Sequence, residues 1–287
     1  MIEEALRYQT EGDDWVKRIA IGGGLLLFSI FLIPVFTVLG YLLEVVRNAL
    51  RGDVEQPPKW GDYDLVDLTI NGLKAFVILF VYSFVVSIIS WVPLTLLGAI
   101  GDALDIGLFA LLGTLVYLTL SLVGGLAVAV ITPVALSNFV LKEEISAGFD
   151  INVMKNIIPE IAMLRAVGIG IVIYLITAIA SGVVSILVIT ALIVPFILFV
   201  GISGIALVWG QGFAEAYETV YGGLPTIPEG PLEKSSPAAG TATPTAAGEP
   251  DPSASSEPAG SGYDDKPAGS DDSTASDGSG DNERWEN

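Results

Sequence analysis

Four long stretches of the sequence carry no charged side chain, and they set the expected fold. They span residues 19–43, 75–101, 106–141 and 166–214, which is 25, 27, 36 and 49 residues. A helix of about 20 apolar residues crosses the hydrocarbon core of a membrane, so each stretch is long enough and the last can cross twice. The pattern predicts an all-α polytopic integral membrane protein. Its expected membrane segments are residues 19–46, 75–100, 107–137, 166–185 and 188–212.

Pro34 interrupts the first charge-free stretch and leaves two paths open. Proline removes a backbone donor and disfavours helix at Ile33 before it. The segment either crosses once as a kinked helix, or enters as far as Pro34 and returns to the same side. Re-entry places all ten lysines and arginines of residues 1–223 on one side, as the positive-inside rule favours. Its two arms, of about 12 residues each, are too short to reach the far side. We favour re-entry and expect four full transmembrane helices after a broken or re-entrant first segment.

Both paths give the same assignment for the larger loops. The basic residues gather before the first stretch and in loops 44–74 and 142–165, whereas the other turns have none. We therefore expect these loops and the C-terminal tail in the cytoplasm of a multi-pass cell-membrane protein. Within the second loop, Ile151, Met154 and Ile158 fall on one helical face and predict a short interfacial helix.

Composition divides the chain into three parts. Residues 1–18 form a polar or interfacial segment, residues 19–223 the membrane domain, and residues 224–287 a tail of Pro, Gly, Ala, Ser, Thr and acidic residues. The tail has too little apolar surface to offset the loss of chain entropy, so we expect it to be disordered. A glycosylated external stalk is the alternative.

The charge balance bears on the host and on the available chemistry. The chain has 13 basic and 32 acidic residues, no histidine and no cysteine. Acidic surfaces stay hydrated at high salt, so the net charge of −19 points to a halophilic host. The lack of cysteine excludes disulfides and thiol chemistry, and the lack of histidine removes the commonest metal ligand. We expect no metal, no cofactor and no nucleic-acid partner; the lipid bilayer is the expected partner.

The stretch "GYLLEVVRNALRGDVEQPPKWGDYDLVDLTINGLKA", residues 40–75, resembles the archaeal, largely haloarchaeal, membrane-protein family catalogued as domain of unknown function 4013. The resemblance rests on a Gly-Tyr pair, a basic helix, a Gly-Asp turn, a Pro-Pro pair with an aromatic, and a Gly-Leu-Lys-Ala entry to the next apolar run. These are Gly40-Tyr41, Arg47, Arg51, Gly52-Asp53, Pro57-Pro58, Trp60 and Gly72-Leu73-Lys74-Ala75. Asn71 stands where the family has Asp. The resemblance covers residues 4–222 and implies no catalytic residues, because the family has no established activity.

Two groups of residues are candidates for function. The first is one proline in each charge-free stretch, which we interpret as static kinks because no ionisable side chain lies beside them to form a transport path. These membrane kinks are Pro34, Pro93, Pro133 and Pro195.

The second group is the loop around "DVEQPPKWGDYD", with positive charge, a stiff proline pair and aromatic side chains that suit the headgroup level. Its candidate residues are Arg47, Arg51, Pro57, Pro58, Lys59, Trp60 and Tyr63. The loop is either a lipid-facing or partner-facing platform, or a rigid connector between two membrane segments.

The sequence therefore predicts a non-enzymatic accessory or lipid-interacting component of a haloarchaeal cell membrane. Loop 44–74 or the tail would be the surface for a protein partner. One alternative is a transporter or channel for an uncharged solute, which predicts a water-accessible cavity lined by Thr114, Thr119, Ser121, Thr132 or Asn138. Another is an intramembrane enzyme, which predicts a cavity where carboxylates converge. The oligomeric state does not follow from the sequence.

Overall fold

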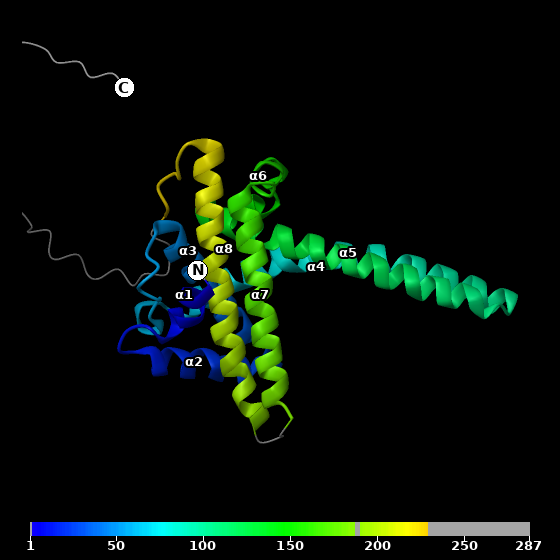
Figure 1. Cartoon of the computed structure of the whole chain (residues 1–287), viewed down its shortest axis with the longest axis horizontal. Helices are drawn as coiled ribbons and strands as arrows, with labels where there is room; N and C mark the ends of the chain where they lie inside the picture. Colours follow the sequence, from blue (N-terminus) through cyan, green and yellow to red (C-terminus); the bar gives the residue numbers. More distant parts are fainter. Residues whose placement is uncertain (1, 187–189, 229–287) are drawn as a thin grey trace, which may run out of the picture. The chain divides into compact units, whose positions relative to one another are not determined.

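The computed structural model describes residues 2–186 and 190–228, and this part of the chain folds into helices without any strand (Figure 1). The expected disordered tail lies almost wholly outside the described residues. The α-helices are α1 (Ile2–Arg7), α2 (Trp15–Leu27), α3 (Ile33–Arg51), α4 (Leu65–Leu104), α5 (Gly107–Lys142), α6 (Ile151–Ile157), α7 (Ile161–Val184) and α8 (Val194–Tyr221). Short 3-10 helices lie at Tyr8–Thr10, Ser29–Phe31, Trp60–Asp62, Ile145–Phe149 and Thr190–Ile193.

Within the described residues, five helices are long and apolar enough to cross a membrane. They are α3, α4, α5, α7 and α8, the last counted from Thr190. The predicted all-α fold is confirmed, and the apolar helices fit the predicted membrane protein. Which path the first segment takes through a bilayer stays a prediction.

The first charge-free stretch is broken close to the predicted position. Helix α2 ends at Leu27, and α3 begins at Ile33 after Leu32, whose φ of 57° lies in the left-handed region. Pro34 occupies the first turn of α3, where its missing N–H has no partner to lose. The stretch thus forms two helices, and α3 continues past the expected end at residue 46 as far as Arg51.

The other three prolines differ in their positions. Pro195 lies in the first turn of α8, so like Pro34 it begins a helix rather than bending one. Pro93 and Pro133 lie inside α4 and α5, where a proline removes a helical hydrogen bond, as the kink interpretation requires.

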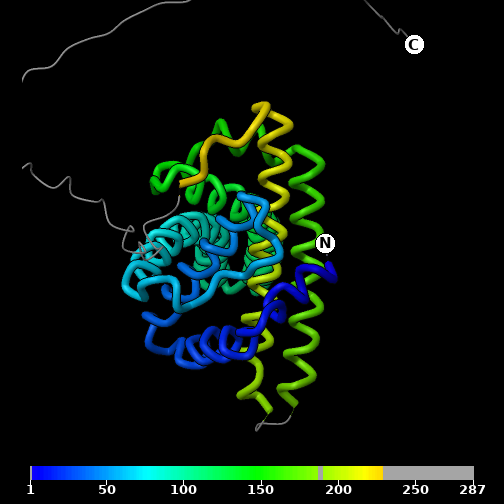
Figure 2. Tube along the Cα trace, turned by 90° about the vertical axis from the view of Figure 1, so that its left-hand side faces the viewer, coloured from blue at the N-terminus to red at the C-terminus, as the bar shows by residue number. Residues whose placement is uncertain are grey.

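The long helices form two antiparallel pairs with α3 between them. Helices α4 and α5 pack against each other, α7 packs against α8, and α3 contacts α4, α5 and α8. In Figure 1 the α4–α5 pair extends past the other helices, and in Figure 2 the same pair is seen nearly end-on. Many large apolar side chains along it are exposed. The N-terminal segment packs on α8, where Ala5 is fully buried, rather than standing apart from the helices.

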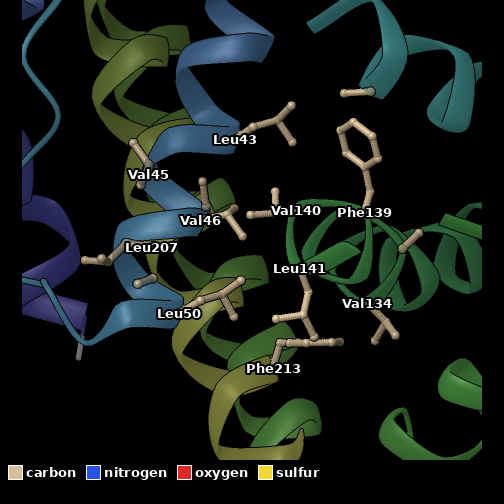
Figure 3. Packing of buried hydrophobic residues seen from close by; sticks show 14 of the residues in the cluster. Leu43, Val45, Val46, Leu50, Val134, Phe139, Val140, Leu141, Leu207 and Phe213 are labelled. Atoms are coloured by element: carbon tan, nitrogen blue, oxygen red, sulfur yellow. The ribbon is translucent and has the colours of Figure 1, made fainter. Parts of the chain in front are cut away.

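The core lies where α3 meets the ends of α5 and α8 (Figure 3). Leu43 and Val46 of α3 face Val140 and Leu141 of α5, and Phe213 of α8 closes the group. The short helix α6 also packs into this core. Its inward face is made by Val153, Met154 and Ile157, while Ile151 is exposed, so the buried face is rotated from the predicted one. Asp150 caps α6 by accepting hydrogen bonds from the backbone N–H groups of Asn152 and Val153.

Two glycines allow α3 and α4 to pack backbone against backbone. A methyl group added at Gly40 would lie 1.9 Å from the Leu68 carbonyl oxygen, and one at Gly72 would lie 1.7 Å from the Phe36 carbonyl oxygen. Helices in membranes approach closely through small residues of this kind, because van der Waals packing is a main source of their attraction. The contact holds the second half of α3 against the start of α4.

We expect Gly72→Ala to destabilise the protein, because the added methyl group forces α3 and α4 apart. Overpacking of a close contact costs about 1–3 kcal/mol or more. Thermal unfolding of the full-length protein in detergent measures the loss. Gly98→Ala on the same helix is the matched control, since nothing lies within 4 Å of its added methyl group. Equal melting temperatures for the two variants would contradict the close contact.

Candidate functional site

The loop predicted as a candidate site is largely folded into the protein. Pro57, Pro58 and Trp60 are buried, Tyr63 is half-buried, and Lys59 is exposed. Arg51 is half-buried and donates a hydrogen bond of 2.8 Å to the Pro228 carbonyl oxygen, which ties the end of α3 to the segment after α8. This placement fits the connector interpretation better than the platform.

A network around Arg18 fixes the loop in place. Trp60 stacks on Tyr41 of α3 with ring centroids 4.2 Å apart, and its indole N–H donates to the Arg18 carbonyl oxygen at 3.2 Å. The Tyr41 hydroxyl donates to the Pro58 carbonyl oxygen at 2.9 Å, and the buried Arg18 guanidinium donates to the carbonyl oxygens of Pro57 and Glu11. A buried guanidinium that donates only to backbone carbonyls holds segments together, and this network joins α2, α3 and the loop.

Three charged side chains meet between α3 and α5, near the end of α3. Arg47 pairs through Nη1 with Glu44, one turn earlier, and through Nη2 with Glu143 at 3.1 Å. The side chains of Glu44 and Arg47 are 3% and 5% exposed, and that of Glu143 is 37% exposed. Such a pair is strongly coupled, because removing one partner leaves a desolvated charge behind. Glu143 follows the last residue of α5, so the ion pairs also join α3 to α5.

The three charged residues line a small polar cavity of about 80 Å³. Asn71 and Lys74 from the start of α4 complete its polar wall, and the Lys74 ammonium donates to the Asn71 side-chain oxygen at 3.1 Å. The close contact of Gly40 and Gly72 explains this arrangement, since it brings one turn of α3 beside one turn of α4.

A second, larger cavity is almost wholly apolar. Its volume is about 490 Å³, and residues of α3, α4, α5, α7 and α8 line it. Aliphatic side chains from five helices form most of its wall, with Thr132 as its one hydroxyl besides Tyr174. The indole N–H of Trp209 is buried in the wall without a hydrogen-bond partner. The exposed side chains of Ile171 and Tyr174 on α7 give the cavity a side facing the exterior.

The two cavities are neighbours, because both have Leu43 in their walls. Both lie near the positions where the charge-free stretches begin or end: Leu43 to Glu44, Lys74 to Ala75, and Leu141 to Lys142. Other ion pairs occur at the same boundaries. Arg165 of α7 pairs with Glu215 of α8, and Lys142 pairs with Asp150 at 3.1 Å. The Lys142 hydrogen bond, followed by the N–H groups of α6, holds the pKa of Asp150 below its usual range.

The sequence did not point to Glu44 and Glu143 as site residues. Both lie just outside a charge-free stretch, and Glu143 comes close to Arg47 only through tertiary packing. A signal was nevertheless present in "LLEVVRNAL", where Glu44 and Arg47 are three residues apart and surrounded by apolar residues. Opposite charges one turn apart on a mostly apolar helix indicate that the two side chains pair with each other in a buried position.

A family model, described as Protein of unknown function (DUF4013), matches residues 24–210. The chain belongs to this family. Comparison with curated proteins and with solved structures gives no match. The residues that carried the resemblance now have structural roles. Gly40 and Gly72 form the close helix contact, and Tyr41 and Trp60 form the stacked pair of the connector. Lys74 lines the polar cavity.

Removing Arg47 should destabilise the protein more than removing Arg47 and Glu44 together. Arg47→Leu leaves the Glu44 carboxylate buried and unpaired, which typically costs about 3–5 kcal/mol. Glu44→Leu with Arg47→Leu removes that charge and leaves only Glu143, which is partly solvated. Thermal unfolding in detergent compares them. A double variant as unstable as Arg47→Leu would show that the Glu44–Arg47 pair itself, rather than the orphaned carboxylate, is the source of the loss.

Proposed function

We propose that the protein is a non-enzymatic, lipid-interacting accessory component of a cell membrane, and that its large cavity binds a lipid hydrocarbon chain. The observation that carries this proposal is the apolar wall of the 490 Å³ cavity. Sites for small molecules have volumes of about 300–1,000 Å³ and a few well-placed polar groups. This cavity has the volume but almost no polar groups, which suits a ligand without polar atoms along its length.

The exposed side of the cavity supports the same proposal. Helices α5 and α7 have few contacts with each other, and the cavity lies between them. A lipid chain can enter such a cavity sideways from the bilayer without crossing a polar surface. The net charge of −19 supports the further proposal of a halophilic host.

The transporter alternative finds less support in the cavity. Of the five polar residues that would mark a solute path, only Thr132 lines the apolar cavity. Thr114 and Thr119 donate to carbonyl oxygens of their own helix, and Asn138 donates to the Ala147 carbonyl oxygen. These groups do not gather along a common path.

The enzyme alternative has one observation in its favour, since Glu44 and Glu143 both line the polar cavity. Both carboxylates are paired with Arg47, however, and the chain has no histidine or cysteine to accompany them as base or nucleophile. Because Arg47 binds both carboxylates, we rank the enzyme below the lipid-interacting protein.

A phenylalanine placed in the cavity should prevent lipid binding. Ala129→Phe fills space in the wall, whereas Ala127→Phe, two residues away, adds the same ring at an exposed position outside it. Delipidated protein in detergent is titrated with a phosphatidylcholine whose chains are brominated, since bromine quenches tryptophan fluorescence on contact. Comparison with Trp209→Phe gives the part of the fluorescence quenching that comes from Trp209. Ala129→Phe should lose this quenching and Ala127→Phe should keep it; equal quenching in both would refute the proposed chain site.

Cysteine labelling tests the proposed membrane topology. The native chain has no cysteine, and Asp13, Asp53, Ala103 and Ser146 are all exposed. We expect an impermeant maleimide added to intact cells to label only Ala103→Cys. Labelling of Asp13→Cys as well would mean that the first segment crosses once. The Arg47–Glu143 pair joins the ends of α3 and α5, so Asp53→Cys and Ser146→Cys should give the same labelling result. Labelling of both would place the two loops outside the cell and contradict the proposed topology.

A further inference from the structure

The polar and apolar cavities adjoin each other on the same three helices. On α3 their linings interleave, since Leu43 lines both cavities and Val46 of the apolar cavity lies between Glu44 and Arg47 of the polar one. The lining changes between Ala75 and Lys74 on α4, and between Leu136 and Phe139 on α5, where Glu143 follows. An apolar space that adjoins a charged one matches the order of groups in a phospholipid.

One basic donor of the polar cavity remains available. Among the described residues, no carboxylate lies within 4.0 Å of the Lys74 ammonium, which donates a hydrogen bond to the neutral side chain of Asn71. A charged donor without an ionic partner makes a strong hydrogen bond to an anionic acceptor, so a negatively charged ligand at this position would be favourable.

We propose that the polar cavity binds the phosphate of a membrane lipid whose hydrocarbon chain occupies the apolar cavity. The phosphate accepts hydrogen bonds from the Lys74 ammonium. The cavity volume of about 80 Å³ exceeds the about 10–15 Å³ that one water needs on the same measure, so it has room for a group of several oxygen atoms. This inference rests on the proposed lipid-chain site and adds the chemical class of the headgroup.

The glutamates do not oppose this assignment. Glu44 and Glu143 both bind Arg47, so their charge is directed toward the guanidinium, and Lys74 supplies a positive charge that they do not use. The half-buried position of Lys74 makes the cavity reachable from outside the helices.

The test compares two lipids that have the same chains and differ in the phosphoglycerol headgroup. Delipidated full-length protein in detergent is titrated with dioleoyl phosphatidylglycerol and with dioleoylglycerol, and bound lipid is counted by native mass spectrometry. The phospholipid should bind about tenfold more tightly, since hydrogen bonds to charged groups are among the stronger ones.

Lys74→Gln should remove this preference without changing dioleoylglycerol binding, and Lys74→Arg should retain it. Lys155→Gln, an exposed lysine on α6, is the matched control and should bind both lipids as the native protein does.

The outcomes separate this inference from the proposed function. If both lipids bind equally to the native protein, the chain site stands and the phosphate assignment is wrong. If neither lipid binds, the proposed function fails as well. If inorganic phosphate binds with the same dependence on Lys74 and displaces the phospholipid, the cavity is a site for a free anion and the lipid assignment is overturned. Equal losses in Lys74→Gln and Lys155→Gln would show a general charge effect and would also overturn it.

Discussion

The contact between Gly40 and Gly72 is the constraint on which the rest of the site depends. Any side chain at either position would meet the carbonyl oxygen of the facing helix, so the two backbones reach their distance only because both residues are glycine. The contact sets the register of α3 on α4 and thereby places Arg47 beside Lys74. Two basic groups held so close would repel each other, and the two glutamates that bind Arg47 offset that repulsion.

The buried ion pairs are a costly way to join helices. Desolvation of two charges can exceed their attraction, and well-packed apolar side chains of similar volume are often at least as stabilising. The chain nevertheless keeps Glu44 and Arg47 almost fully buried at the point where the apolar part of α3 ends. A charged group retained at that cost is easier to understand as part of a binding site than as a source of stability, which is why we propose the polar cavity as a binding site.

The helical fold could be predicted from the sequence, whereas the tertiary contacts of the candidate residues could not, for physical reasons. Long charge-free stretches and Pro34 act through local chain properties, so the helices and the break before α3 could be predicted from them. The loop residues were chosen for their exposed chemistry, yet Trp60 is buried because Tyr41 and Arg18, far away in sequence, provide a stacking face and an acceptor. Likewise, Glu143 reaches Arg47 across 96 residues of chain, which no local pattern reports.

The lengths of the helices have a consequence for the surrounding bilayer. The charge-free parts of α7 and α8 are about 30 Å long and match the hydrocarbon thickness of an ordinary membrane, whereas those of α4 and α5 are about 40 and 50 Å long. A bilayer that holds the first pair upright holds the second only if it is tilted, and Figure 1 shows the pairs running in different directions. Since helix packing sets the tilt and α3 packs against both pairs, the bilayer has to accommodate the longer pair by that tilt or by local thickening.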